Sequence, residues 1–138
     1  MLVRCTIDHP DPILHDEWLS RWANGSALEL TQGTLYPVLA VSRYEGQYFV
    51  FVLGDESNRY PLAFPAALFD LVDGRLPDSW DRAETRVAAV AELNLGERQI
   101  CSFEPWAQAE DAFYEQLLDE DPVALRRFEA YRDSILAG

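Results

Sequence analysis

The chain has 138 residues, of which 49% are hydrophobic and 12% aromatic. This composition can supply a sizeable core and excludes a disordered chain. Aspartate and glutamate number 24, whereas basic residues number 11 and are all arginine, so the net charge is −13. The charge predicts that the chain binds neither nucleic acid nor an anionic membrane, whose phosphates require cationic partners, and that it attracts basic proteins. The length predicts a single domain over residues 1–138.

The N-terminal segment and the cysteines both predict a cytoplasmic protein. Residues 1–7 are too short and too polar to form the apolar region of a secretory signal. The longest unbroken apolar run, Tyr48–Leu53, is far shorter than the ~20 residues that cross a bilayer. Cys5 and Cys101 lie far apart in the sequence and neither belongs to a Cys-x-x-Cys pair, so we expect two reduced, buried thiols.

The beginning of the chain predicts a strand followed by a short helix. Residues 2–7 form the expected strand, which ends where two prolines follow. Asp16 is the expected N-cap of a helix whose Trp18 and Trp22 share one face. Asn24-Gly25 then ends that helix.

Residues 28–74 have the pattern of short strands separated by turns. The run at 47–53 predicts a central strand because both of its faces are apolar. Pro61 predicts that its own strand lies at a sheet edge, since proline has no backbone donor. The expected strands are 35–43, 47–53, 59–64 and 69–72, with a turn at Glu45-Gly46 and a helical turn at 65–68.

The segment 75–98 carries mixed signals. Residues 75–80 form an expected loop that Trp80 anchors to the core. In residues 87–95 the alanine content favours a helix, whereas the alternation of apolar side chains favours a strand, and we predict the strand. A further strand is expected at 98–103.

Two helices are predicted at the C-terminus, over 104–138. Glu104-Pro105 and Asp121-Pro122 each place an acidic N-cap before a proline at the first helical position. The tight connection at 119–121 predicts an antiparallel hairpin. The apolar faces are Trp106, Ala109, Phe113 and Leu117 in the first helix and Ala124, Phe128, Tyr131 and Ile135 in the second.

These elements predict an α+β fold, in which a small bent antiparallel β-sheet or SH3-like barrel carries the C-terminal antiparallel helical hairpin. Residues 1–103 are expected to be mainly β with a short N-terminal helix, and residues 104–138 to form the hairpin. The predicted core is Leu35, Leu39, Val41, Phe49, Phe51, Leu53, Leu62, Phe64, Leu68, Phe69, Trp106, Phe113, Leu117, Phe128 and Ile135.

Residues 30–73 resemble small bacterial SH3-like barrel proteins, several of which are similar to immunity proteins of polymorphic toxin systems. The resemblance rests on Leu30, Thr31, Gly33, Tyr36, Val38 and Leu39, followed by Tyr60, Pro61, Pro65, Leu68, Phe69 and Val72. It implies a barrel in which Gly33 serves a turn, Tyr36 and Leu39 serve the core, and Pro65 and Phe69 serve the closing turn. It also implies a protein that binds and blocks a cognate toxin. No binding residue transfers, because the matched positions are structural.

The densest group of metal-ligand residue types lies between Asp8 and Glu17. His9, Asp11, His15 and Asp16 are its candidate ligands, and they would suit a small metal-dependent hydrolase. The spacing matches no established ligand motif. The alternative is a solvated loop followed by a helix N-cap, where carboxylates favour the positive end of the helix dipole. The metal site is therefore retained only as an alternative.

Signatures of other catalysis are weak. Cys101 lies in an apolar segment with no adjacent base, which indicates a buried, inert thiol. The chain has no G-x-S-x-G elbow, no glycine-rich phosphate loop, and no lysine for Schiff-base chemistry. We therefore expect no enzymatic activity and no cofactor.

Acidic residues accumulate in the helical hairpin without compensating arginines. The window from Gln99 to Leu125 has a charge of −7, and basic residues return only at Arg126. One interpretation is a solvated helix face, which is what most charge runs are. Exposed helices usually mix charges at i,i+4, however, and unrelieved like charge costs stability, which a basic partner would explain. The acids are Glu104, Glu110, Asp111, Glu115, Asp119, Glu120 and Asp121.

These observations predict an immunity-type stoichiometric inhibitor that binds a basic protein, such as a cognate toxin. The hairpin acids other than Glu104 are the candidate contacts, and exposed aromatic residues would provide anchors. The two alternatives are the metal-dependent hydrolase and an interaction module of a larger assembly. The sequence leaves the oligomeric state open. The alternative for the tryptophans is that they fill the open end of the barrel. The candidate anchors are Trp18, Trp22, Tyr44 and Tyr114.

Overall fold

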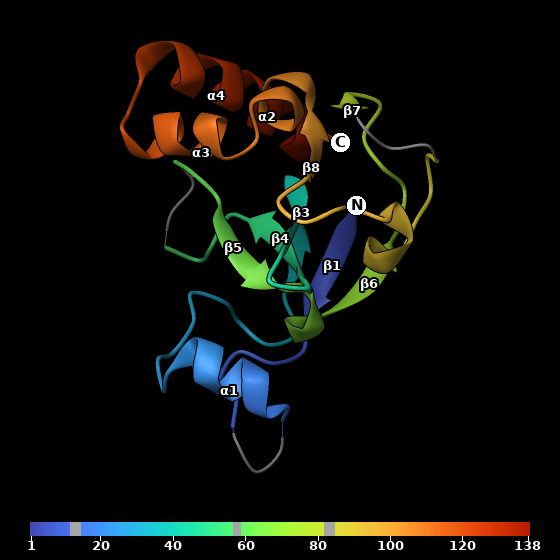
Figure 1. The fold of residues 1–138 in the computed structure, drawn as a ribbon, viewed down its shortest axis with the longest axis vertical. Helices are drawn as coiled ribbons and strands as arrows, with labels where there is room; N and C mark the ends of the chain where they lie inside the picture. The colour runs from blue at the N-terminus through green and yellow to red at the C-terminus, as the bar shows by residue number, and fades with distance from the viewer. Residues whose placement is uncertain (12–14, 57–58, 82–84) are drawn as a thin grey trace.

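A computed structural model describes residues 1–11, 15–56, 59–81 and 85–138. Two antiparallel sheets lie beside a layer of C-terminal helices, and helix α1 lies at the opposite end of the molecule (Figure 1). In chain order the elements are β1 (Leu2–Cys5), α1 (Glu17–Ala23), β2 (Leu35–Pro37), β3 (Ala40–Tyr44), β4 (Gln47–Val52), β5 (Leu62–Pro65), η1 (Ala66–Leu68), β6 (Phe69–Asp73), β7 (Trp80–Asp81), η2 (Val90–Leu93), β8 (Ile100–Phe103), α2 (Glu104–Ala109), α3 (Asp111–Leu118) and α4 (Pro122–Leu136).

The smaller sheet has the strand order β2-β1-β6. Its central strand alternates as a half-buried strand should, with Val3 and Cys5 buried and Arg4 exposed. Arg4 lies directly opposite Leu35 on one side and Asp70 on the other, so these three side chains share the outward face.

The larger sheet has the order β5-β4-β3-β8-β7. Strand β4 lies between two neighbours and β5 lies at the edge, as the sequence predicts. Strands β3 and β4 join through Glu45 and Gly46, whose φ angles of 52° and 75° suit the right-handed twist of a tight hairpin. The predicted turn is therefore confirmed.

The α+β class is confirmed, but the sheets do not close into a barrel. The chain changes sheet between β2 and β3, because β2 pairs with β1 whereas β3 pairs with β4 and β8. It changes sheet again at η1, which redirects the chain from the edge strand β5 to β6. Two separate sheets therefore replace the single bent sheet that the sequence predicts.

The strand predicted at 87–95 is wrong. Val87 makes one isolated bridge with Arg75, and the 3₁₀ turn η2 follows. The Glu92 carboxylate accepts a hydrogen bond from the Ala89 amide at 2.8 Å, and Asn94 ends the turn with φ 50°. The hydrogen bond between Glu92 and Ala89 therefore stabilises a short turn here, although the alternation of apolar side chains predicts a strand.

The first predicted C-terminal helix is divided in two. Glu110, with φ 52° and ψ −128°, separates α2 from α3. The predicted antiparallel hairpin is formed by α3 and α4. Asp121 caps α4 by accepting a hydrogen bond from the Ala124 amide at 2.9 Å, and Pro122 occupies the first turn, as the sequence predicts.

Most of the predicted core is buried. Leu53, Leu62 and Ile135 are partly buried and pack against the core. Leu35 is the exception at 43% exposure, because it points to the outward face of β2 while its neighbour Tyr36 points inward. The confirmed core residues are Leu39, Val41, Phe49, Phe51, Phe64, Leu68, Phe69, Trp106, Phe113, Leu117 and Phe128.

A buried hydroxyl joins the helices to the larger sheet. The Tyr131 hydroxyl of α4 accepts a hydrogen bond from Trp80 Nε1 at 2.6 Å and donates one to the Leu39 carbonyl at 2.6 Å. The Tyr131 ring also stacks on Phe103 of β8 with ring centroids 4.1 Å apart. The group therefore links α4 to β7, β8 and the start of β3.

Replacing Tyr131 by Phe should lower the free energy of unfolding by about 2 kcal/mol, because the buried Trp80 N–H loses its acceptor. Tyr114→Phe is the matched control, since it removes a single hydrogen bond, to the Pro61 carbonyl, and should cost about 1 kcal/mol. Urea unfolding of both variants measures the difference. Equal losses would contradict the role assigned to the Tyr131 network.

Candidate functional site

The hairpin acids divide into exposed groups and groups with structural roles. Asp111 and Glu115 are exposed on α3, and Asp119 is exposed where α3 ends. Within the described part of the chain, no hydrogen bond or salt bridge occupies the carboxylates of these three residues. They are the acids most available to a partner.

The remaining hairpin acids help to build the fold. Glu110 adopts the left-handed φ that separates α2 from α3, and its amide donates to the Trp106 carbonyl at 2.8 Å. Asp121 caps α4. Glu120 has φ 59° and forms a salt bridge with Arg59 at 3.0 Å, with both side chains more than half exposed. A surface pair of this kind contributes little to stability.

Two exposed apolar side chains flank the connection between α3 and α4. Leu118 is 47% exposed at the end of α3, and Val123 is 48% exposed at the start of α4. Leu118 lies on the same stripe as Asp111 and Glu115, because helical neighbours on one face are three or four residues apart. The sequence analysis missed this pair, although each residue falls one position outside the predicted buried stripe.

We name this surface the acidic tip. It consists of Asp111, Glu115, Leu118, Asp119, Glu120 and Val123. An apolar centre beside charged groups is the arrangement that protein-binding surfaces use, since the apolar groups supply affinity and the charges steer association.

Tyr114 holds the acidic tip in place. Its hydroxyl donates to the Pro61 carbonyl at 2.7 Å, and its ring packs against Phe51 and Trp106 with centroid distances of 5.2 and 5.8 Å. Burial raises the pKa of Tyr114 to about 12. This residue therefore fixes α3 against the larger sheet and is only partly accessible to a partner.

The other predicted anchors lie away from the acidic tip. Trp18 and Trp22 belong to α1, at the far end of the molecule (Figure 1), and are partly buried in edge-to-face contact with Phe49 and Phe64. Tyr44 is 45% exposed at the end of β3, with the Arg98 guanidinium 5.5 Å from its ring centre.

The candidate metal ligands are engaged in local structure. Asp16 caps α1 by accepting a hydrogen bond from the Trp18 amide at 2.7 Å. His15 Nδ1 accepts a hydrogen bond from the Asp11 amide at 2.8 Å, and His9 is exposed. Across the described ranges, no three His, Cys, Asp or Glu residues are placed so that they could hold a metal ion. Residues 12–14 of this cluster lie outside those ranges.

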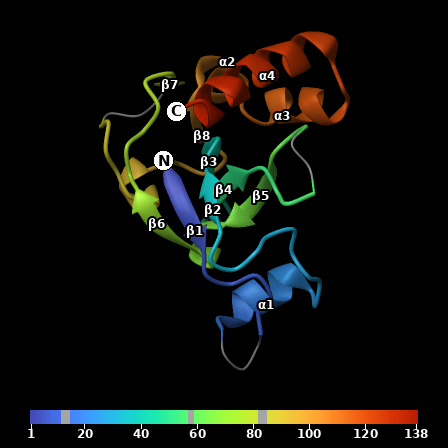
Figure 2. The ribbon, with the colours of Figure 1, turned by 180° about the vertical axis from the view of Figure 1, so that it is seen from behind.

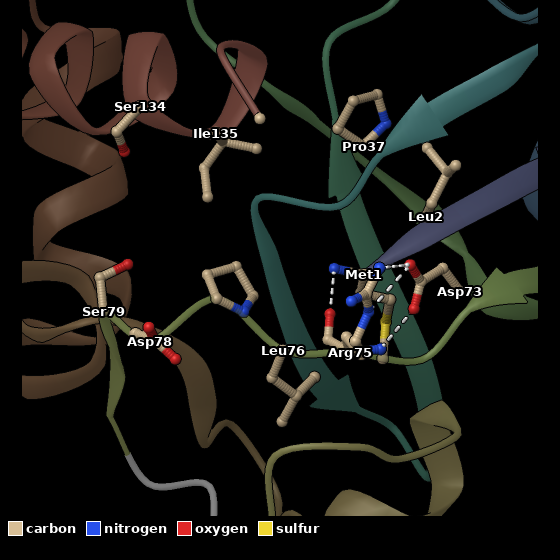
Figure 3. Close-up of a pocket in the computed structure, with 12 residues that line it drawn as sticks. Met1, Leu2, Pro37, Asp73, Arg75, Leu76, Asp78, Ser79, Ser134 and Ile135 are labelled. Carbon is tan, nitrogen blue, oxygen red and sulfur yellow. Dashed lines mark hydrogen bonds and ion pairs between the residues drawn. The ribbon is translucent and has the colours of Figure 1, made fainter.

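A cavity of about 810 Å³ opens between the end of α4 and the start of β1. Figure 3 shows Ile135 and Ser134 on one wall and Leu2 and Pro37 on another. Asp73 and Arg75 form a salt bridge at 3.2 Å on its rim. Hydrogen bonds from Arg75 lower the pKa of Asp73. The sequence analysis did not predict this cavity, because its walls come from segments far apart in the chain.

Both cysteines are buried, as the sequence predicts. Burial raises the pKa of the Cys101 thiol to about 11 and also raises the pKa of Cys5. These thiols remain protonated near neutral pH, which is the opposite of what a nucleophilic cysteine needs.

The pKa of Cys101 makes stability pH-dependent. Between pH 9 and 10 the unfolded chain, with an ordinary pKa of 9.0, loses this proton while the folded chain retains it. The free energy of unfolding should therefore fall as the pH rises through this window. Urea unfolding at several pH values should show a smaller fall for Cys101→Ala than for the wild-type chain. The same fall in the free energy of unfolding with pH in both proteins would contradict a raised pKa of Cys101.

No family model, curated protein or solved structure matches this chain. Among the described residues, no helix combines the length and the apolar character needed to cross a membrane. The argument for function therefore rests on the surfaces of the chain itself.

Proposed function

We propose that this chain is a stoichiometric inhibitor that binds a basic protein, in the manner of an immunity protein that covers a cognate toxin. The supporting observation is the acidic tip, where Leu118 and Val123 are exposed beside carboxylates that have no cation on their own helix. A basic partner would neutralise the charge and bury the apolar pair.

The rigidity of the tip supports a docking role. Tyr114 ties α3 to Pro61, which directly precedes β5, and the Tyr131 network ties α4 to the larger sheet. A preformed surface loses little conformational freedom on binding, which favours affinity. The interaction-module alternative shares this surface and differs only in the identity and the fate of the partner.

The test of inhibition uses the reading frame that adjoins the gene for this chain. Its product is expressed in a laboratory bacterium with and without the chain. We expect a basic product that arrests growth, and full rescue by co-expression at equal stoichiometry. A non-toxic product, or one that the chain does not bind, would contradict inhibition.

Removing charge from the acidic tip should slow association with that basic product. We expect Glu115→Gln combined with Asp119→Asn to lower the association rate several-fold at low salt and to flatten its salt dependence, because both carboxylates steer the encounter. Surface plasmon resonance across a salt series measures this.

The matched control is Glu17→Gln combined with Asp78→Asn, which removes the same net charge from exposed positions outside the hairpin. This control should retain near wild-type kinetics. Equal effects in the two double variants would show that total charge, and not the acidic tip, governs association.

The apolar pair should govern dissociation instead. Leu118→Ala combined with Val123→Ala should raise the dissociation rate by ~10-fold or more while changing the stability of the free chain little, since both side chains are exposed. Leu136→Ala combined with Val87→Ala provides the control, because these side chains are also exposed but lie elsewhere. Unchanged dissociation in the first variant would remove the apolar pair from the interface.

A further inference from the structure

The outward face of the smaller sheet is open to solvent. Leu35, Arg4 and Asp70 form one row across β2, β1 and β6, and all three are exposed. Leu71 of β6 is also exposed, at 43%, but it lies opposite the buried Val3 and therefore belongs to the other face of the sheet. The outward face therefore presents Leu35 beside one cation and one anion.

This face differs electrostatically from the rest of the chain. Arg4 and Asp70 balance each other, and neither forms a salt bridge within the ranges described. In the next row Leu2 lies opposite Pro37 and Asp73, and Asp73 is neutralised by Arg75. The face is thus close to neutral on a chain of net charge −13.

We propose that this face binds a second copy of the same chain. Two copies of an acidic protein repel each other over most of their surfaces, so association requires a neutral, self-complementary patch. A basic partner gains little here, because Arg4 and Arg75 offset the attraction of Asp70 and Asp73. The open face of β2-β1-β6 is close to neutral, and its charge pattern is self-complementary.

The register determines how two copies fit. Neighbouring strands are ~4.8 Å apart, so a two-fold axis that runs between β1 and β6, parallel to them, places Arg4 of each copy opposite Asp70 of the other. The same axis places each Leu35 against the outer edge of β6 in the other copy. The opposite charges of the two copies are therefore matched.

The arrangement leaves the acidic tips accessible. The α3–α4 connection and β6 lie on opposite sides of the molecule in both views (Figures 1 and 2). A dimer formed through the smaller sheet would display two acidic tips that point away from its centre.

Charge exchange tests this interface on the purified full chain. Sedimentation velocity at ~100 μM should show a species of twice 15.7 kDa for the wild-type chain. Arg4→Asp and Asp70→Arg should each be monomeric, because like charges then meet across the axis. A mixture of the two single variants should form a heterodimer, and the double variant Arg4→Asp/Asp70→Arg should dimerise again.

Circular dichroism first establishes that each variant is folded, and Glu115→Gln/Asp119→Asn serves as a control that should remain dimeric. A monomeric wild-type chain would overturn the proposal. So would single variants that remain dimeric, or charge-exchanged pairs that fail to reassociate. If the single variants instead lose binding to a basic protein, the face belongs to that partner and the proposal is wrong.

Discussion

The Tyr131 hydroxyl is the constraint on which the arrangement of this molecule depends. It connects α4 at the C-terminus to the Trp80 indole and the Leu39 carbonyl, which come from two different parts of the larger sheet. Ser102 of β8 donates to the same Leu39 carbonyl at 2.8 Å. Because these groups are buried, breaking one contact leaves a polar group without a partner, so the helices and the sheet are held in one relative position.

The position of the helical layer determines what the hairpin can do. Trp106 and Tyr114 pack their aromatic rings against Phe51, which directs one side of α2 and α3 toward β4. The other side of α3 is left to solvent with Asp111, Glu115 and Leu118 upon it. The same packing that stabilises the fold therefore concentrates negative charge and apolar surface at one end of the molecule, where a cationic protein can reach both.

The fold leaves two exposed surfaces that differ in charge. The acidic tip is strongly negative and suits a partner of opposite charge, whereas the open face of the smaller sheet is nearly neutral and suits a second copy. Their separation on opposite sides of the molecule allows both contacts at once. Under the two proposals, different kinds of partner bind different faces, because like-charge repulsion suppresses self-association everywhere except where charges balance.

The sequence by itself determined the elements whose signals are local. Asp16 and Asp121 cap helices because a carboxylate next to free amides acts without help from distant residues, and Gly46 helps to turn the chain because glycine adopts positive φ readily. Only the tertiary structure decided the features that depend on distant partners. The chain forms two open sheets because β2 pairs with β1 and β3 with β4 and β8, a choice that strand propensity does not encode. The tertiary structure likewise decided which hairpin acids remain free, since Glu120 meets Arg59 from a segment some 60 positions earlier. It also exposed Leu35 and Leu118, because a shift of one residue determines which face a side chain occupies.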